Sequence, residues 1–268
     1  MISFIASYPK SGSTWLRLLF NAYFMGRCNI NQIAFTTGDI HPYHYQNVSA
    51  RPLRELSSTE IVHLRPAALM QIMATWPVNP ILVKTHSVNA TLDDIPLIPF
   101  RMTKRAFYVI RDPRDVAVSY SNHFGVSIFN AIESMGKETN WVGDPDSNFG
   151  HEVSSWSNHV NSWLDETKFP VHLVRYEALH ERPKEVFANI LDRMELEINN
   201  DHLNQAIELT DFDKLKDQEK KSGFQEAPKG RKFFKTGKVG YWKEVLSSTQ
   251  EQRIIDQHGK TMERLGYV

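Results

Sequence analysis

The chain has 268 residues, of which 41% are hydrophobic, and its 31 Lys and Arg balance 31 Asp and Glu. This balance argues against a nucleic-acid-binding protein, and no apolar run approaches the roughly 20 residues that cross a bilayer. A single cysteine, Cys28, excludes an intrachain disulfide framework. We therefore expect one soluble α/β domain over residues 1–268, located in the cytoplasm, with neither nucleic acid nor membrane as a partner.

Apolar runs that end in polar segments predict strands over Ile2–Ser7, Ile81–Thr85, Arg105–Ile110 and Val171–Arg175. Several runs are continuous, as expected of strands buried on both faces of a parallel sheet. Helices are predicted over Thr14–Met25, Asp115–Phe124, Arg182–Met194 and Thr249–Leu265. The alternation predicts a three-layer α/β/α fold with a central, mainly parallel sheet and a site at the carboxyl ends of the strands.

Two segments have no clear period. Residues 38–56 are predicted to form a loop over the site. Residues 127–155 mix Asn, Gly, Asp and Glu with Trp141 and Phe149, which favours a mobile, lid-like insertion.

The most informative segment directly follows the first strand and leads into a helix. It contains Lys10, Ser11, Gly12, Ser13, Thr14 and Trp15. Free N–H groups at a helix start, the positive end of its dipole and a lysine together form an anion-binding loop. Because the lysine precedes the single glycine, the order differs from the Walker A loop of nucleotide triphosphatases.

This loop resembles the 5′-phosphosulfate loop of the sulfotransferases that use 3′-phosphoadenosine 5′-phosphosulfate (PAPS). The resemblance implies that Ser11, Gly12, Ser13 and Thr14 bind the 5′-phosphate and that Lys10 assists the leaving group. Three further segments, in the order of the family's motifs, extend the resemblance over residues 7–243.

Lys84, Thr85 and His86 end the second predicted strand. Residues two apart on an extended chain point to the same side, so Lys84 and His86 can both face the site. A neutral imidazole can take the proton that a hydroxyl loses as it attacks sulfur, and lysine can offset charge on the departing phosphate. In the resembled family this Lys-Thr-His sequence carries the catalytic base, which implies that His86, Lys10 and Lys84 are catalytic.

Arg111 follows the third predicted strand, and Ser119 lies on the helix after it. A guanidinium forms bidentate pairs with phosphate, and a serine hydroxyl adds a third bond. The segment resembles the family's 3′-phosphate motif. The alternative is a purely structural turn, in which the charges of Arg-Asp-Pro-Arg-Asp pair with one another.

The fourth segment, residues 233–243, has two glycines three apart among basic and aromatic residues. It resembles the family's late phosphate loop with departures, since Lys235 and Thr236 stand where arginine and lysine are usual. Gly237 matches the family pattern, and Arg231 is an alternative source of the guanidinium. The resemblance also implies that Trp15, Tyr176, Thr210 and Phe212 contact the adenine; ordinary core packing is the alternative for these aromatic residues.

The sequence thus predicts a PAPS-dependent sulfotransferase that moves a sulfuryl group by in-line displacement to the hydroxyl, or alternatively the amine, of a small acceptor. A specialised metabolite is the favoured acceptor, PAPS is the donor, and no metal is expected. The alternatives are a non-catalytic nucleotide-binding module on the same fold and a small-molecule kinase. Acceptor identity and oligomeric state stay open.

Overall fold

Five strands form the main sheet of the computed structural model, in the order β2 (Thr36–Gly38), β3 (Ile81–Thr85), β1 (Ile2–Ser7), β6 (Thr103–Ile110) and β9 (Val171–Arg175). The β1–β3 and β2–β3 pairs are parallel. The structure describes residues 1–143, 148–165 and 167–268. The predicted α/β class with a central parallel sheet is confirmed.

Strands β1 and β6 lie close to where the sequence predicts them because they are mainly apolar and buried on both faces. All six residues of β1 are buried, as are the six residues from Arg105 to Ile110 of β6. A strand buried on both faces shows no alternation of polar and apolar residues. The predicted bounds of β1, β3 and β9 match those in the structure, and β6 begins two residues earlier than predicted.

The chain forms two compact units, each assembled from three segments. The first unit comprises Met1–Tyr8, Thr36–Tyr108 and Ser134–Leu173, and the second comprises Pro9–Phe35, Val109–Glu133 and Val174–Val268. The ends of β6 and β9 continue from the first unit into the second. The single domain expected from the sequence stays a prediction.

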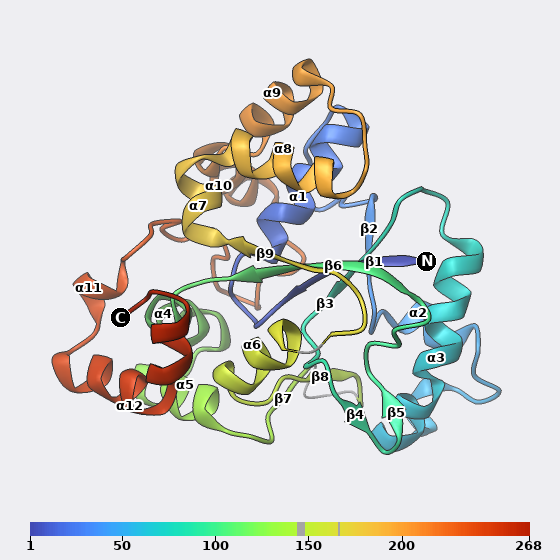
Figure 1. The fold of residues 1–268 in the computed structure, drawn as a ribbon, viewed down its shortest axis with the longest axis horizontal. Coiled ribbons are helices and arrows are strands. Elements are labelled where there is room, and N and C mark those ends of the chain that lie inside the picture. Colours follow the sequence, from blue (N-terminus) through green and yellow to red (C-terminus); the bar gives the residue numbers. More distant parts are fainter. Residues whose placement is uncertain (144–147, 166) are drawn as a thin grey trace. The chain divides into compact units, whose positions relative to one another are not determined.

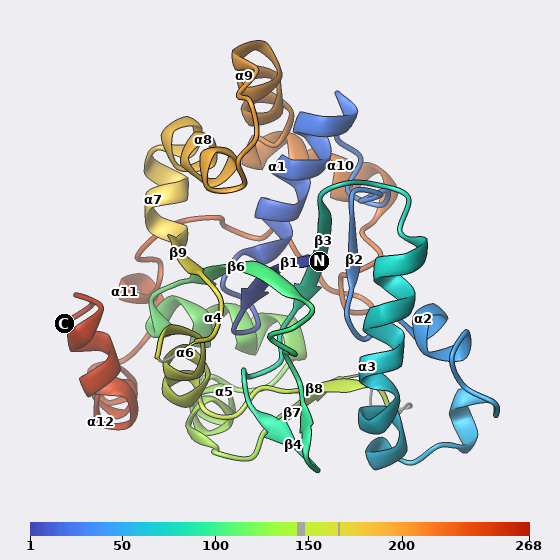
Figure 2. The ribbon, with the colours of Figure 1, turned by 45° about the vertical axis from the view of Figure 1, so that its right-hand side comes forward.

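The first unit holds most of the sheet, with a few helices and two hairpins. Its further elements are α2 (Pro42–Gln46), η1 (Leu53–Glu55), α3 (Ser58–Thr75), α6 (Trp156–Leu164), and the hairpins β4 (Thr91–Leu92) with β5 (Ile95–Pro96) and β7 (Trp141–Gly143) with β8 (Gly150–Glu152). Helix α3 lies beside the edge strand β2 in both views (Figures 1 and 2). Trp163 of α6 packs against Phe4 of β1 and Tyr108 of β6, which attaches that helix to the sheet.

The second unit is almost entirely helical. Its elements are α1 (Ser13–Met25), α4 (Pro113–Phe124), α5 (Ile128–Gly136, which ends in the first unit), α7 (Tyr176–Glu181), α8 (Pro183–Arg193), α9 (Asn200–Leu209), α10 (Phe212–Ser222), α11 (Trp242–Val245) and α12 (Ser248–Arg264). Asp112 caps α4 ahead of Pro113, and Gly125 ends it in the left-handed conformation. A buried cluster joins α1, α10 and the segment after α10 through Leu18, Leu215, Phe224 and Phe234.

One expectation needs correction, and one long helix was not predicted. The predicted loop over residues 38–56 contains the helix α2 and the short turn η1, and β2 precedes them. The 18-residue helix α3 was not predicted, although its capping box, Ser57 with Glu60, is a recognisable start signal.

In the lid-like segment 127–155, residues 144–147 lie outside the described part, and the remainder holds α5 and the β7–β8 hairpin. Its mobility stays a prediction.

Candidate active site

The predicted base, His86, directly follows β3 and faces the last residue of β1. Its Nδ1 lies 2.7 Å from the backbone oxygen of Ser7 and 3.1 Å from the Ser7 hydroxyl. A carbonyl oxygen can only accept, so Nδ1 of neutral His86 carries the proton and donates it to Ser7. Nε2 then bears the lone pair, which is the atom a general base uses.

A buried histidine, His159, supports the backbone of the half-buried His86. Nε2 of His159, on α6, donates to the His86 carbonyl over 3.0 Å, and its Nδ1 accepts from the Tyr108 hydroxyl over 2.8 Å. Both bonds together define the tautomer of His159. The network therefore connects α6 and β6 to the residue that would act as base.

A third histidine, His151 of β8, packs edge-on against the His86 ring with 5.5 Å between ring centres. Its Nδ1 lies 3.0 Å from the Ser87 hydroxyl and 3.8 Å from a carboxylate oxygen of Asp39. Asp39 also pairs with Arg65 of α3. Both members of this ion pair are buried, so His151 lies between a paired carboxylate and the predicted base.

This environment keeps the imidazoles neutral. Burial, followed by the charge of Lys84, lowers the pKa of His86 well below its ordinary value, and the same two causes lower the pKa of His151. Burial also lowers the pKa of His159 to about 4. His86 is thus unprotonated, and able to accept a proton, at neutral pH.

The predicted phosphate loop begins the second unit. Gly12 has φ 104°, and a Cβ there would lie 2.5 Å from the Tyr176 ring, so only glycine fits. Lys10 has φ 71°, a conformation that is uncommon for residues other than glycine. Within the described part of the chain, no side chain caps the start of α1 at Gly12, which suits a loop whose N–H groups receive an anion.

Two buried polar atoms near this loop have no hydrogen-bond partner among the described residues. They are the Ser11 hydroxyl oxygen and Nε of Arg111. A buried polar group without a hydrogen-bond partner lowers the stability of the fold, so these two atoms fit a site in which a ligand supplies the missing hydrogen bonds. Both atoms can donate, as an anionic ligand requires.

The Thr14 hydroxyl and Arg17 both contact Glu226, over 3.4 Å and 2.7 Å. Thr14 is a predicted 5′-phosphate ligand, so its hydroxyl has a carboxylate partner in this structure. Ser13 is buried beside it in the first turn of α1.

Arg111 and Tyr176 form the centre of the predicted 3′-phosphate region. The guanidinium lies 4.2 Å from the centre of the Tyr176 ring and donates to the Lys238 carbonyl over 3.0 Å. The Tyr176 hydroxyl donates to the Gly237 carbonyl over 3.2 Å. The early and late loops therefore both contact Tyr176. The alternative of an internally paired turn also has support, since Arg111 pairs with Asp115 over 3.5 Å and Arg114 pairs with Asp112 over 2.8 Å.

The residues predicted to contact adenine gather in the second unit. Trp15 packs edge-on against Tyr176 with ring centres 6.0 Å apart and donates to the Thr210 carbonyl over 3.1 Å. A Cβ on Gly237 would lie 2.5 Å from the Phe212 ring, so Phe212 lies against the late loop. The Thr210 hydroxyl donates to the Ala206 carbonyl, and the Thr210 carbonyl accepts from Trp15.

The remaining predicted residues lie at the edges of these clusters. Ser119 is half-buried on α4, and Thr236 is half-buried in the late loop. Lys235 donates to the Asn122 side chain over 2.7 Å, and Arg231 donates to the Asn122 carbonyl over 3.2 Å. Lys84 and His86 belong to the first unit and all the other predicted site residues to the second.

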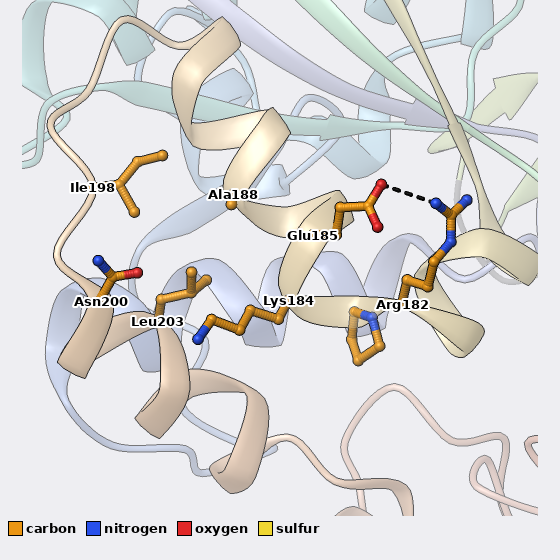
Figure 3. Close-up of a pocket in the computed structure, with 8 residues that line it drawn as sticks. Arg182, Lys184, Glu185, Ala188, Ile198, Asn200 and Leu203 are labelled. Atoms are coloured by element: carbon orange, nitrogen blue, oxygen red, sulfur yellow. Dashed lines mark hydrogen bonds and ion pairs between the residues drawn. The ribbon is translucent and has the colours of Figure 1, made fainter.

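A surface hollow of about 590 Å³ lies away from these residues, between α8 and α9 (Figure 3). Leu203 and Ile198 supply apolar lining, and Glu185 pairs with Arg182 over 2.9 Å at its rim. None of the predicted site residues lines it.

Sequence reasoning missed the residues around the base: His151, His159, Tyr108, Asp39 and Arg65. They lie in five separate segments, and no local motif marks them. Asp115 was also missed; it accepts from the backbone N–H groups of Gly240 and Trp242 over 2.8 Å and 2.9 Å and so anchors the late loop.

Comparisons with known proteins agree with the motifs. The model of the sulfotransferase domain matches residues 3–266. Sulfotransferase 1B1 of Canis lupus familiaris is 26% identical over 266 residues, covering 96% of this chain and 82% of that protein. Sulfotransferase 1A1 of Rattus norvegicus is 25% identical over 268 residues, covering 96% and 83%.

Two solved structures of similar fold contain PAP. Retinol dehydratase, in complex with androsterone and the inactive cofactor PAP, has a TM-score of 0.63 at 19% identity and covers 97% of this chain and 80% of its own. Mouse sulfotransferase SULT7A1, complexed with PAP, has a TM-score of 0.60 at 18% identity and covers 98% and 84%. These likenesses show a shared fold, and because the family model spans nearly the whole chain, this protein belongs to the sulfotransferase family.

Proposed function

We propose that this sulfotransferase moves a sulfuryl group from PAPS to the hydroxyl of a small-molecule acceptor by in-line displacement. The observation that carries the proposal is the bond from His86 Nδ1 to the Ser7 carbonyl, which leaves Nε2 as a proton acceptor. The related structures that contain PAP support the choice of donor.

The second unit would hold the donor. Ser11, Gly12, Ser13 and Thr14 would bind the 5′-phosphate, since they lie at the open N-terminus of α1. Arg111 and Ser119 would bind the 3′-phosphate, with Lys235, Thr236 and Gly237 contributing from the late loop. Trp15, Tyr176, Thr210 and Phe212 would enclose the adenine.

When bound, the donor supplies the sulfuryl group that is transferred. Nε2 of His86 takes the proton that the acceptor hydroxyl loses as its oxygen attacks sulfur. Lys10 and Lys84 offset the negative charge that develops on the phosphate oxygen when its bond to sulfur breaks. The role of Lys84 also includes keeping His86 neutral, because its charge lowers the pKa of His86.

The acceptor is proposed to be a specialised metabolite with a hydroxyl group. The structure of retinol dehydratase with androsterone indicates that this fold can receive a hydrophobic alcohol. We further propose a cytoplasmic location. Among the described residues, no helix combines the length and the apolar character needed to cross a bilayer.

A screen of small alcohols, phenols and amines with labelled PAPS tests the proposal, with His86→Ala as the control that lacks the base. Transfer of label to an acceptor by the wild type, and its loss in the variant, is the expected result. Binding of PAP without transfer to any acceptor would instead favour a non-catalytic module. Transfer of phosphate from ATP would favour a kinase.

A further inference from the structure

The predicted catalytic Lys10 and two aromatic side chains of the second unit, His123 and Phe233, contact one another. Nζ of Lys10 lies 3.1 Å from Nδ1 of His123 and 3.9 Å from the centre of the Phe233 ring. The rings of His123 and Phe233 meet edge-on, with 5.9 Å between their centres and 86° between their planes. Each member of this group, called here the lysine clamp, therefore contacts both others.

The two aromatic members of the lysine clamp are anchored by the fold. His123 lies in the last turn of α4, which Gly125 ends. Phe233 donates its backbone N–H to Glu219 of α10 over 2.6 Å, and its ring packs on Phe224 with 4.9 Å between centres. The clamp thus offers a fixed surface to the flexible lysine side chain.

The chemistry of the contact defines the state of His123. An ammonium has only hydrogens to donate, so Nδ1 of His123 must accept and the ring proton lies on Nε2. A protonated His123 would instead place two cations 3.1 Å apart. The attraction of the ammonium to the Phe233 face adds to the hydrogen bond.

We propose that His123 is a positioning residue for Lys10, holding its ammonium beside Phe233 in the orientation from which it reaches the leaving phosphate of the donor. This inference rests on the proposed function, because it takes Lys10 to be the group that stabilises the leaving phosphate. Lys10 has many rotamers in solution, and holding it in advance removes an entropic cost from the reaction.

Paired variants separate positioning from general structural damage. His123→Leu keeps an apolar contact with Phe233 but removes the acceptor, whereas His123→Asn places an amide oxygen near the position of Nδ1. We expect His123→Leu to lower kcat roughly tenfold, because the side chain of Lys10 regains rotamer freedom that must be lost again in the reaction. The affinity for PAP should stay unchanged within about twofold. His123→Asn should retain most of the wild-type kcat.

The control is His63→Asn on the exposed face of α3, which should leave both values unchanged. Wild-type kcat in His123→Leu would overturn the proposal. So would an equal loss of kcat in both His123 variants, because that pattern indicates a structural role.

A nitrogen NMR measurement on the donor-free protein tests the contact without relying on activity. The ring of His123 should show an unprotonated Nδ1 whose resonance moves when Lys10 is replaced by Met, since the variant removes the hydrogen bond. An identical Nδ1 resonance in wild type and Lys10→Met would overturn the proposal. If the wild type sulfates no acceptor, the proposed function fails, and this measurement still decides whether His123 holds Lys10.

Discussion

The Nδ1 atom of His86 lies 2.7 Å from the backbone oxygen of Ser7, so a peptide carbonyl determines which nitrogen of the imidazole can act as a base. Ser7 ends β1 and His86 follows β3, and these two strands pair in parallel with Ala6 opposite Thr85. The orientation of the base is therefore a consequence of strand register. A shift in that register would move His86 away from Ser7.

Replacing His86 with Asn tests the role of this imidazole. The Asn amide can still donate to Ser7 but cannot accept a proton, so we expect turnover to fall about 10²–10⁴-fold, as for loss of a general base. PAP binding, measured by calorimetry, should stay at its wild-type value. Undiminished turnover in this variant, with a hydroxyl acceptor, would remove His86 from the mechanism.

The protonation of His86 should depend on Lys84. Burial and the Lys84 charge both lower the pKa of His86, so NMR titration of the donor-free protein should find it below 6.5. Lys84→Met removes a positive charge and should raise that pKa, which moves the loss of the proton-accepting form to higher pH. A downward shift in the variant would contradict this assignment.

Arg111 should contribute to nucleotide affinity. Arg111→Ala removes charge-assisted bonds worth about 1.5–3 kcal/mol each, so the Kd for PAP should rise roughly ten- to hundredfold. Arg111→Lys keeps the charge but loses the planar group that lies on Tyr176. Its affinity for PAP should therefore lie between those of the wild type and the Ala variant. Calorimetric titration measures all three, and a Kd of the Ala variant equal to that of wild type would exclude Arg111 from the site.

Two glycines with positive φ provide a matched test of the phosphate loop. Gly12→Ala introduces backbone strain together with a Cβ 2.5 Å from the Tyr176 ring, whereas Gly223→Ala, at the end of α10, introduces strain with no atom within 4 Å. We expect the Gly223 variant to lose about 1–2 kcal/mol of unfolding free energy and the Gly12 variant to lose more. Urea unfolding and PAP titration measure the effects; only Gly12→Ala should also abolish tight PAP binding.

Stability should fall as the pH is lowered, because buried His159 resists protonation. Its pKa is about 4 in the folded protein, against about 6.5 in an unfolded chain. Between these values the unfolded chain binds the proton and the folded protein does not, so acid favours unfolding. The contribution of His159 is complete above pH 6.5 and is lost as the pH falls toward 4, by roughly 2 kcal/mol at pH 5.

Urea unfolding at pH 7.5 and pH 5 measures this loss in the wild type and in His159→Gln. The variant should lose less stability between the two pH values, whatever its stability at pH 7.5. An equal loss in both proteins would show that His159 does not carry this pH dependence.

The sequence by itself determined the features that depend on contiguous residues. The runs Ile2–Ser7 and Ile81–Thr85 form strands at those bounds because each is a mainly apolar run whose residues are buried or half-buried in the sheet. The family was predictable for the same reason, since each motif is a short contiguous segment, and the first three lie at the end of a strand or directly after one. Helix α3 was missed even though its local signal, the Ser57 and Glu60 capping box, is present in the sequence.

Only the tertiary structure decided which distant side chains surround those motifs. His151 reaches His86 from a hairpin 65 residues later in the chain, and His123 reaches Lys10 across 113 residues. Such contacts depend on how strands and helices pack, and the local sequence around a residue does not predict them. The residues expected to carry the chemistry could therefore be predicted locally, whereas the residues that set their protonation and orientation could not.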